Sequence, residues 1–388
     1  MWIRDPRHLG VKEVIVSCLA FALIVGLMVA CSGELTPTPE RATVVRSEMS
    51  ESPLKEAMFY EKLSGNRVQC QICPRRCIIP EGERGFCRNR ENRGGTLYSL
   101  VYGKPCTVNM TVPEKGPLYH FIPGHRRLAL ATVSCNLRCK YCQNWQISQR
   151  SVEEVSHYDL SPEEIVELAL KNKAKSVSFT YTEPTAFYEY VYDISRLARE
   201  RGLKTSIISN GFINPEPLRE LLKVLDAVKI DLKGFSEEFY AEVSSARLEP
   251  VLTSLKIVKE EGVHLEIVNL VLPTLNDDPE MIRAMCQWIK DNLGEDVPLH
   301  FTRFFPNYRL TNLPPTPVET LEMAREIALD VGLQYVYIGN VPGHEANNTY
   351  CPKCGKLLIR RAYMAILENN IVNGRCKFCG HKIPGIWE

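Results

Sequence analysis

The chain has 388 residues, of which 45% are hydrophobic, and this length allows two or three globular domains. Its formal net charge is +1, from 47 basic and 46 acidic side chains, so no basic excess supports binding to nucleic acid and we expect none. The 15 cysteines are the unusual feature. Eleven of them fall into three compact groups, and their spacing favours metal sites over a disulfide framework.

The first 31 residues have the pattern of a signal or anchor segment. Arg4, Arg7 and Lys12 precede an uncharged apolar run over residues 14–30, which is shorter than the roughly 20 residues of a spanning helix. The run ends in small residues before Cys31, which resembles a bacterial lipoprotein processing site; a plain signal anchor is the alternative. We expect the protein to associate with a membrane through residues 1–31. The sequence does not decide on which side of that membrane the rest of the chain lies. Polar residues 32–55 are predicted to form a flexible tether.

The first cysteine group has the spacing C-x2-C-x3-C-x9-C and is predicted to organise a Cys-rich lobe over residues 56–115. Four thiolates at this spacing can close a tetrahedral zinc site or hold an iron–sulfur cluster. The pattern does not choose between a metal that stabilises a small lobe and a second electron-transfer cluster. The candidate ligands are Cys70, Cys73, Cys77 and Cys87.

The second group is the C-x3-C-x2-C run of Cys135, Cys139 and Cys142, which follows an apolar segment that is predicted to be a buried strand. Three thiolates on one loop can bind three irons of a 4Fe–4S cluster and leave the fourth iron open to a small ligand. A zinc knuckle or free core thiols are the alternatives. With Tyr141 and Trp145, this spacing resembles the radical SAM superfamily, whose members bind S-adenosylmethionine (SAM) at the open iron.

From residue 128 onward, strand and helix patterns alternate. Strands are predicted over 128–133, 176–181, 204–209, 227–231, 264–272, 297–303 and 334–338. Helices are predicted after Ser161 and over 186–201, 215–224, 236–243, 253–261, 279–293 and 317–331. Repeated βα units give an α/β fold with a parallel sheet. The radical SAM resemblance implies a partial (βα)6 TIM-like barrel over residues 116–340, whereas periodicity alone also allows an eightfold barrel or a doubly wound sheet.

Polar residues at the carboxyl ends of these strands are candidate ligands, because parallel α/β folds bind their ligands there. The second strand ends in TYTEPT, and the resemblance implies that Glu183 binds the amine of SAM, although the family's two glycines are missing from this turn. The third strand ends in SNG, and the resemblance supports contacts from Ser209 and Asn210 to the ribose hydroxyls.

The fourth strand ends in KIDLKG, and alternation places Lys229, Asp231 and Lys233 on one face. Asp231 and Lys233 resemble a DLK motif of pyruvate formate-lyase-activating-type enzymes, which implies a position near the SAM carboxylate and the substrate. Arg303 and His344, in later strand ends, are further hypotheses for substrate contact.

The third cysteine group consists of two C-x2-C knuckles, each followed by glycine, in residues 341–388. This pattern predicts a zinc-ribbon-like lobe. Its predicted zinc ligands are Cys351, Cys354, Cys376 and Cys379.

Taken together, CNLRCKYCQN, SFTYTEPT, ISNG, KIDLKG, NVPGHE and the terminal knuckles resemble the radical SAM enzyme of the AmmeMemoRadiSam system. The resemblance implies reductive cleavage of SAM to a 5′-deoxyadenosyl radical that abstracts hydrogen from an unknown substrate, which can be a protein. It further implies a low-potential electron donor and a link to AMMECR-like and Memo-like proteins. The alternatives are a glycyl-radical-enzyme activase and an iron–sulfur electron-transfer or scaffold protein without SAM chemistry.

Overall fold

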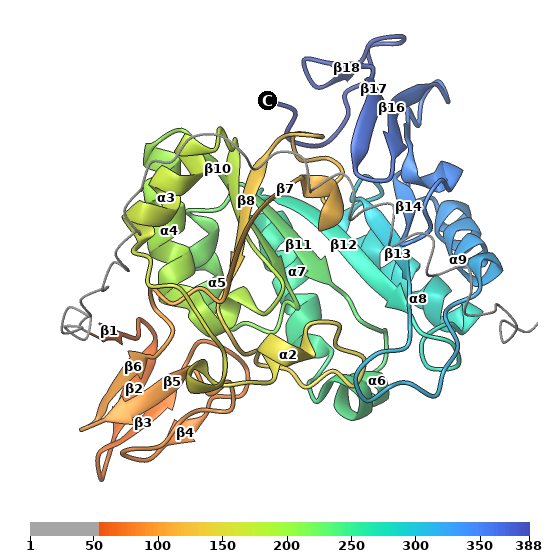
Figure 1. The fold of residues 1–388 in the computed structure, drawn as a ribbon. Coiled ribbons are helices and arrows are strands. Elements are labelled where there is room, and N and C mark those ends of the chain that lie inside the picture. The colour runs from red at the N-terminus through yellow and green to blue at the C-terminus, as the bar shows by residue number, and fades with distance from the viewer. Residues whose placement is uncertain (1–53) are drawn as a thin grey trace, which may run out of the picture. The chain divides into compact units, whose positions relative to one another are not determined.

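The computed structural model describes residues 54–388, so the signal-like segment 1–31 and almost all of the tether lie outside the described residues. Within residues 54–388, no helix is both long enough and apolar enough to span a lipid bilayer. The described elements fall into three groups along the chain: small sheets before residue 100, a large α/β region, and small sheets after residue 348 (Figure 1).

An eight-stranded sheet forms the centre of the α/β region, with the strand order β14-β13-β12-β11-β10-β9-β8-β7. Strands β8 to β14 are parallel and adjacent in chain order. They are β8 (Arg127–Ala131), β9 (Ser176–Phe179), β10 (Lys204–Ser209), β11 (Ala227–Asp231), β12 (His264–Val271), β13 (Leu299–Arg303) and β14 (Val336–Gly339). Nearly all their residues are buried, as in parallel strands covered on both faces. The predicted α/β fold with a parallel sheet is confirmed.

The edge strand β7 (Thr107–Thr111) was not predicted from the sequence. It pairs antiparallel to β8, and its side chains are half-buried or exposed. Its sequence, TVNMT, is largely polar, because its side chains are not covered on both faces as those of the central parallel strands are. The sheet is therefore mixed, with one antiparallel edge.

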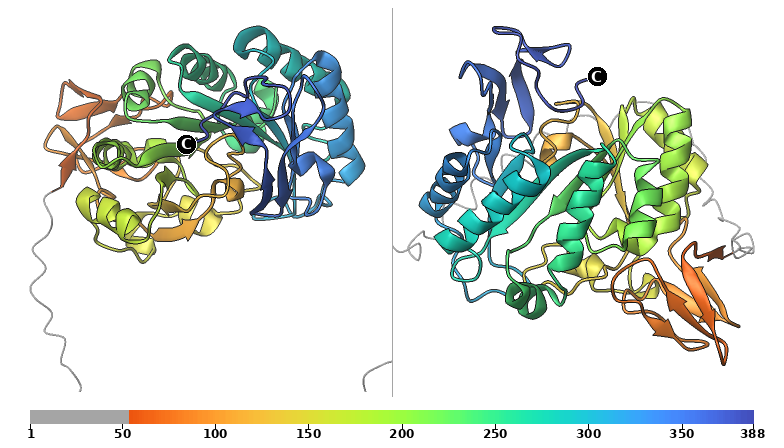
Figure 2. Two further views of the ribbon diagram at one scale, coloured as in Figure 1. Left: turned by 90° about the horizontal axis from the view of Figure 1, so that it is seen from above. Right: turned by 180° about the vertical axis from the view of Figure 1, so that it is seen from behind.

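Six helices connect successive parallel strands and lie over one face of the sheet (Figures 1 and 2). They are α3 (Pro162–Lys171), α4 (Tyr188–Glu200), α5 (Pro215–Leu222), α7 (Glu249–Glu260), α8 (Pro279–Leu293) and α9 (Val318–Val331). Each has an apolar stripe toward the sheet. The start of α3 is set by a capping box, in which Glu164 N donates to Ser161 Oγ at 3.2 Å and Ser161 N donates to Glu164 Oε2 at 2.7 Å.

The helix predicted over residues 236–243 takes a different form. A short α6 (Glu237–Phe239) passes into a π-helical turn, Tyr240–Ser244. The carbonyls of Val243 and Ser244 accept hydrogen bonds from the backbone of Lys140 and Arg138, at 2.9 and 3.1 Å. These bonds to the central cysteine loop replace the next helical turn, so the helix ends here.

Short helical turns complete the α/β region. They are η1 (Pro113–Lys115), α2 (Trp145–Ser148), η2 (Val152–Glu154), η3 (Pro184–Phe187) and η5 (Glu345–Asn347).

The N-terminal region consists of two small antiparallel sheets. One contains β1 (Lys55–Glu56), β6 (Thr96–Ser99) and β5 (Arg90–Arg93), and the other contains β2 (Tyr60–Leu63), β3 (Arg67–Cys70) and β4 (Ile78–Ile79). A buried ion pair joins this region to α4: Arg90 Nη1 and Nη2 donate to Glu189 Oε1 and Oε2 at 2.9 and 3.0 Å. Their side chains are only 2% and 0% exposed, so the pair fixes β5 against the helix.

The C-terminal region also consists of short antiparallel strands. They are β15 (Thr349–Tyr350), β16 (Leu357–Ala362), β17 (Ala365–Asn369), β18 (Ile371–Val372) and β19 (Arg375–Cys376). The tail that follows pairs with the segment ahead of β8: Ile386 N donates to His120 O at 2.8 Å, and Ile122 N donates to Ile386 O at 2.7 Å. The tail is thereby joined to the lead-in of the first parallel strand.

Candidate active site

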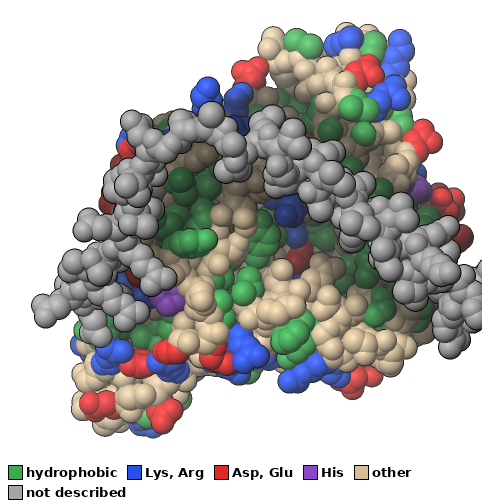
Figure 3. All heavy atoms as spheres, viewed as in Figure 1, with side chains coloured by type: hydrophobic (Ala, Val, Ile, Leu, Met, Phe, Trp, Pro, Cys, Tyr) green, Lys and Arg blue, Asp and Glu red, His purple; other side chains and the backbone are tan. Residues whose placement is uncertain are grey.

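A pocket of about 1080 Å³, called the main pocket below, opens at the carboxyl ends of the parallel strands. Figure 3 shows a hollow in this face, with basic and acidic side chains at its floor. Residues that follow each of β8 to β11 line it, together with residues in β12 and β13 and just after β14. Because each βα connection brings one strand end to this edge, residues far apart in sequence meet here.

Cys135, Cys139 and Cys142 all line the main pocket. Leu137 N donates to Cys135 Sγ at 3.3 Å, and Asn210 Nδ2 donates to the same sulfur at 3.7 Å. Burial, and secondly the nearby Glu183 carboxylate, raise the pKa of the Cys135 thiol. Such a group becomes a thiolate readily only when a cation binds it, which is the situation of a metal ligand.

Glu183 lines the main pocket and joins two strand ends through hydrogen bonds. Its Oε1 accepts from Thr185 N at 3.0 Å, Thr185 Oγ1 at 2.8 Å and Ser209 Oγ at 2.8 Å, and its Oε2 accepts from Asn210 N at 2.8 Å. Burial raises the pKa of Glu183, while these four hydrogen bonds favour its charged form. The carboxylate thus positions Asn210, which lines the pocket; Ser209 does not reach the lining.

The charged residues at the end of β11 form one ionic cluster. Lys229 pairs with Asp231 Oδ1, and Lys233 Nζ lies 3.4 Å from Asp231 Oδ2. Burial by itself would raise the pKa of Asp231, but the charges of Lys229 and Lys233 outweigh it and hold that pKa below its usual range. Asp231 and Lys233 line the main pocket, so an ionised carboxylate and an ammonium group are both presented to a ligand.

Two candidates for substrate contact, Arg303 and His344, do not line the main pocket and stay predictions. Arg303 lies outside the lining of the main pocket and donates from Nε to Thr316 O at 2.8 Å. His344 caps the short turn η5 and pairs with Glu322 at 3.2 Å. Arg303 ends β13 and His344 follows β14, and the side chains of both make local contacts.

Sequence reasoning did not assign several lining residues to the site, among them Lys115, Tyr181, Thr302 and Asn340. Lys115 belongs to η1, ahead of the first parallel strand, and no local pattern marks it. Tyr181 and Asn340 have positive φ angles of 67° and 60°, so each strand turns sharply there. Polar residues that directly follow a predicted strand are the signal that could have identified Asn340.

The C-terminal cysteines form a closed group. Sγ atoms of Cys351, Cys354, Cys376 and Cys379 all lie within 4.8 Å of one another, with pairs at 3.6 and 3.8 Å. Four Zn–S bonds of about 2.3 Å in a tetrahedron place sulfurs about 3.8 Å apart. The quartet therefore has dimensions that suit one tetrahedral ion.

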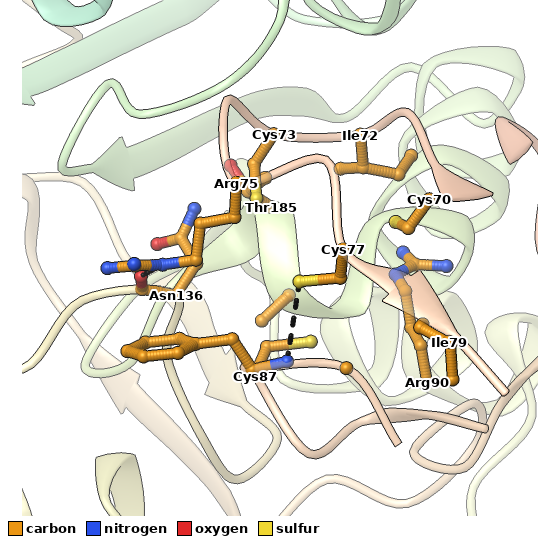
Figure 4. Close-up of a pocket in the computed structure, with 13 residues that line it drawn as sticks. Cys70, Ile72, Cys73, Arg75, Cys77, Ile79, Cys87, Arg90, Asn136 and Thr185 are labelled. Atoms are coloured by element: carbon orange, nitrogen blue, oxygen red, sulfur yellow. Dashed lines mark hydrogen bonds between the residues drawn. The ribbon is translucent and has the colours of Figure 1, made fainter. Parts of the chain in front are cut away.

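The N-terminal cysteines face a separate cavity of about 380 Å³, called the N-terminal cysteine pocket. Its lining includes all four predicted ligands, Cys70, Cys73, Cys77 and Cys87 (Figure 4). The structure thus brings together the cysteines of each of the three sequence groups.

Comparison with known proteins places these features in a family. Residues 130–286 match the sequence model described as Radical SAM superfamily. The uncharacterized protein MJ0808 of Methanocaldococcus jannaschii is 51% identical over 332 residues, covering 85% of this chain and 99% of that protein. The pyruvate formate-lyase-activating enzyme of Clostridium pasteurianum is 29% identical over 166 residues, covering 40% of this chain and 66% of the enzyme.

Among solved structures, a domain of the pyruvate-formate lyase-activating enzyme of Bacteroides vulgatus is similar, at 18% identity and a TM-score of 0.38. The match covers 43% of this chain and all of that domain.

Proposed function

Because this chain belongs to the radical SAM superfamily and is an enzyme, we propose that it cleaves SAM reductively in the main pocket. The observation that carries the proposal is the meeting of Cys135, Cys139 and Cys142 with Asn210, Asp231 and Lys233 around one open space. When bound, a 4Fe–4S cluster supplies the electron that splits SAM into methionine and a 5′-deoxyadenosyl radical.

The residues present fit a cluster with one open iron. Three thiols line a roomy pocket, and N–H groups of Leu137 and Asn210 point at the Cys135 sulfur, as donors do around iron–sulfur ligands. Glu183 and Ser209 would hold Asn210 in place beside SAM. Asp231 and Lys233 would meet the charged amine and carboxylate of its methionine part.

The fold supports this assignment. We interpret β8 to β13 with the helices that follow them as a partial (βα)6 TIM-like barrel, flanked by an N-terminal Cys-rich lobe and a C-terminal zinc-ribbon-like lobe. A zinc ion held by the C-terminal cysteines would stabilise that second lobe.

Hydrogen abstraction from a protein segment is the substrate class we favour. A second opening of about 720 Å³, the side pocket, shares Lys115 and Asn340 with the main pocket. Its outer wall includes Tyr363 and Met364 of the β16–β17 hairpin, and Tyr363 is 67% exposed. An extended chain could lie along both openings, whereas a small metabolite needs only one.

A glycyl-radical-enzyme activase is the second candidate function. The name of the Clostridium pasteurianum relative favours it, and a protein substrate suits it. A stable glycyl radical detected by electron paramagnetic resonance (EPR) in a partner protein would distinguish it from other hydrogen abstractions. An electron-transfer or scaffold role without SAM chemistry predicts no SAM cleavage at all.

The proposed partners come from the resemblance to the radical SAM enzyme of the AmmeMemoRadiSam system, and the proposed location comes from the N-terminal segment. We propose a low-potential electron donor, a functional link to AMMECR-like and Memo-like proteins, and membrane association through residues 1–31. Deletion of residues 1–52 should release a protein that still binds its cluster, because those residues precede the described fold. Full-length protein found only in the soluble fraction would contradict the membrane proposal.

The direct test is anaerobic reconstitution with iron and sulfide, followed by SAM, dithionite and an assay for 5′-deoxyadenosine. We expect the product from the wild type and from Cys286→Ser, a variant at a buried cysteine outside the three groups. Protein that carries a full cluster but makes no 5′-deoxyadenosine would overturn the proposal.

A further inference from the structure

The N-terminal cysteine pocket is a cavity bounded by four thiols and by two guanidinium groups. Cys70 ends β3, Cys73 and Cys77 lie on the loop to β4, and Cys87 precedes β5. Figure 4 shows the four side chains on different sides of the cavity, with Arg75 and Arg90 at its margin. We propose that this pocket binds a second iron–sulfur cluster of the 4Fe–4S type, with these four cysteines as its ligands.

The two quartets of the chain differ in their spacing. In the C-terminal quartet, the four sulfur atoms all lie within 4.8 Å of one another. Among residues 54–388, no other group of three or more potential metal ligands is this compact. The N-terminal quartet lines a pocket instead, and its sulfurs are not drawn into such a group. A single zinc ion holds its four sulfurs close together, whereas a cluster places irons and sulfides between them. The N-terminal geometry therefore suits a cluster.

The three cysteines of the main pocket provide an internal comparison. They too line an open space rather than a closed group, and radical SAM membership assigns them to a cluster. Within the same structure, the N-terminal quartet thus resembles the cluster-binding set in that its sulfurs are not drawn into one closed group, and it differs from the zinc-like set.

The charges around the pocket favour an anionic group. Arg90 lines the pocket while pairing with Glu189, and Arg75 also lines it, with its guanidinium carbon 3.5 Å from the centroid of the Phe86 ring. Phe86 N donates to Cys77 Sγ at 3.5 Å. Guanidinium groups at the margin and an N–H donor directed at sulfur favour a cluster whose thiolate ligands make it negatively charged.

A thin wall separates this pocket from the main pocket. Asn136 and Thr185 line the N-terminal cysteine pocket, while their neighbours Cys135 and Glu183 line the main pocket. Arg75 Nε donates to Asn136 O at 2.6 Å across this boundary.

Two further contacts join the ligand loops themselves. Ser134 Oγ donates to the carbonyl of Cys87, and Asn89 Nδ2 donates to Val133 O at 2.8 Å. Two clusters held so close can exchange electrons: the second would take one electron from a low-potential donor protein and return to its oxidised state as it reduces the first by one.

The experiment isolates the second site in the full chain. Cys135, Cys139 and Cys142 are all replaced by Ala, and the protein is reconstituted anaerobically with iron and sulfide. Iron, sulfide and zinc are measured per chain, and the dithionite-reduced protein is examined by EPR. We expect about four irons and four sulfides to remain, against about eight in the wild type, with an S = 1/2 signal of a reduced cluster.

A matched pair of variants assigns the remaining iron. Adding Cys73→Ser and Cys77→Ser to the triple variant should remove it, whereas adding Cys106→Ser, at a cysteine outside the three groups, should leave it. A triple variant with no iron and about two zincs per chain would overturn the inference. So would a wild type with only about four irons, because that measurement does not depend on the folding of any variant. Neither readout requires SAM cleavage, so the inference can fail while the proposed function stands.

Discussion

Replacing Glu189 with Gln should destabilise the protein by about 3–5 kcal/mol, the usual cost of removing one partner from a buried ion pair. Glu189 Oε1 accepts from Arg90 Nη1 and from Met58 N, and Oε2 accepts from Arg90 Nη2. An amide keeps one acceptor but turns an NH2 toward the other guanidinium nitrogen. One charge-assisted hydrogen bond, worth about 1.5–3 kcal/mol, is lost, and Arg90 stays buried without its counter-charge.

The assay is equilibrium urea unfolding followed by circular dichroism, on proteins with matched iron and zinc contents. Glu200→Gln is the control, because it breaks an exposed pair with Arg196 on the same helix and should cost below about 0.5 kcal/mol. Replacing Arg90 with Met and Glu189 with Leu together should recover more than half of the loss, since no buried charge remains. A loss below about 1 kcal/mol for Glu189→Gln would refute the reasoning. So would a double variant whose loss equals the sum of the losses of Arg90→Met and Glu189→Leu measured alone.

Three further outcomes are expected. Cys139→Ala should abolish 5′-deoxyadenosine formation, because two thiolates cannot hold three irons; product at wild-type rates would contradict this. Cys376→Ser should remove about one zinc per chain and lower the unfolding temperature while iron content stays constant; iron in place of zinc in the wild-type quartet would contradict it. Burial lowers the pKa of His125 to about 4, so the unfolded chain takes up a proton first and stability falls between about pH 6.5 and 4. His125→Gln should reduce that loss by about 3 kcal/mol in urea titrations at each pH, and an unchanged slope would count against it.

The fold could be predicted where burial produces a recognisable pattern of residues in the sequence. The apolar run over residues 128–133 predicted a parallel strand, and Ser161 marked a helix start. Strand β7 has no such pattern in its sequence, because it lies at the edge of the sheet. The π-helical turn at Tyr240–Ser244 depends on hydrogen bonds to residues a hundred positions earlier, which no local propensity encodes.

Some residues of the candidate site could likewise be predicted from the sequence, and others could not. Strand-end reasoning named Asp231 and Lys233, which do line the main pocket, but it also named Arg303, whose side chain turns toward Thr316. A residue's position after a strand is readable from sequence, whereas the direction of its side chain is set by packing. Lys115 reaches the pocket only through the path of the chain ahead of β8.

The pairing of the tail with residues 120–122 affects how the protein is made. His120 Nδ1 lies 2.6 Å from Pro384 O, although 264 positions separate the two residues. On the ribosome, the lead-in to β8 is synthesised long before its partner, and contacts of such long separation form late. The nascent α/β region therefore lacks the Phe121–Ile386 pairing until the C-terminal tail has emerged. With zinc bound by the C-terminal cysteines as proposed, zinc supply during translation would govern the yield of finished protein, and zinc starvation should leave incomplete α/β regions that chaperones and proteases recognise.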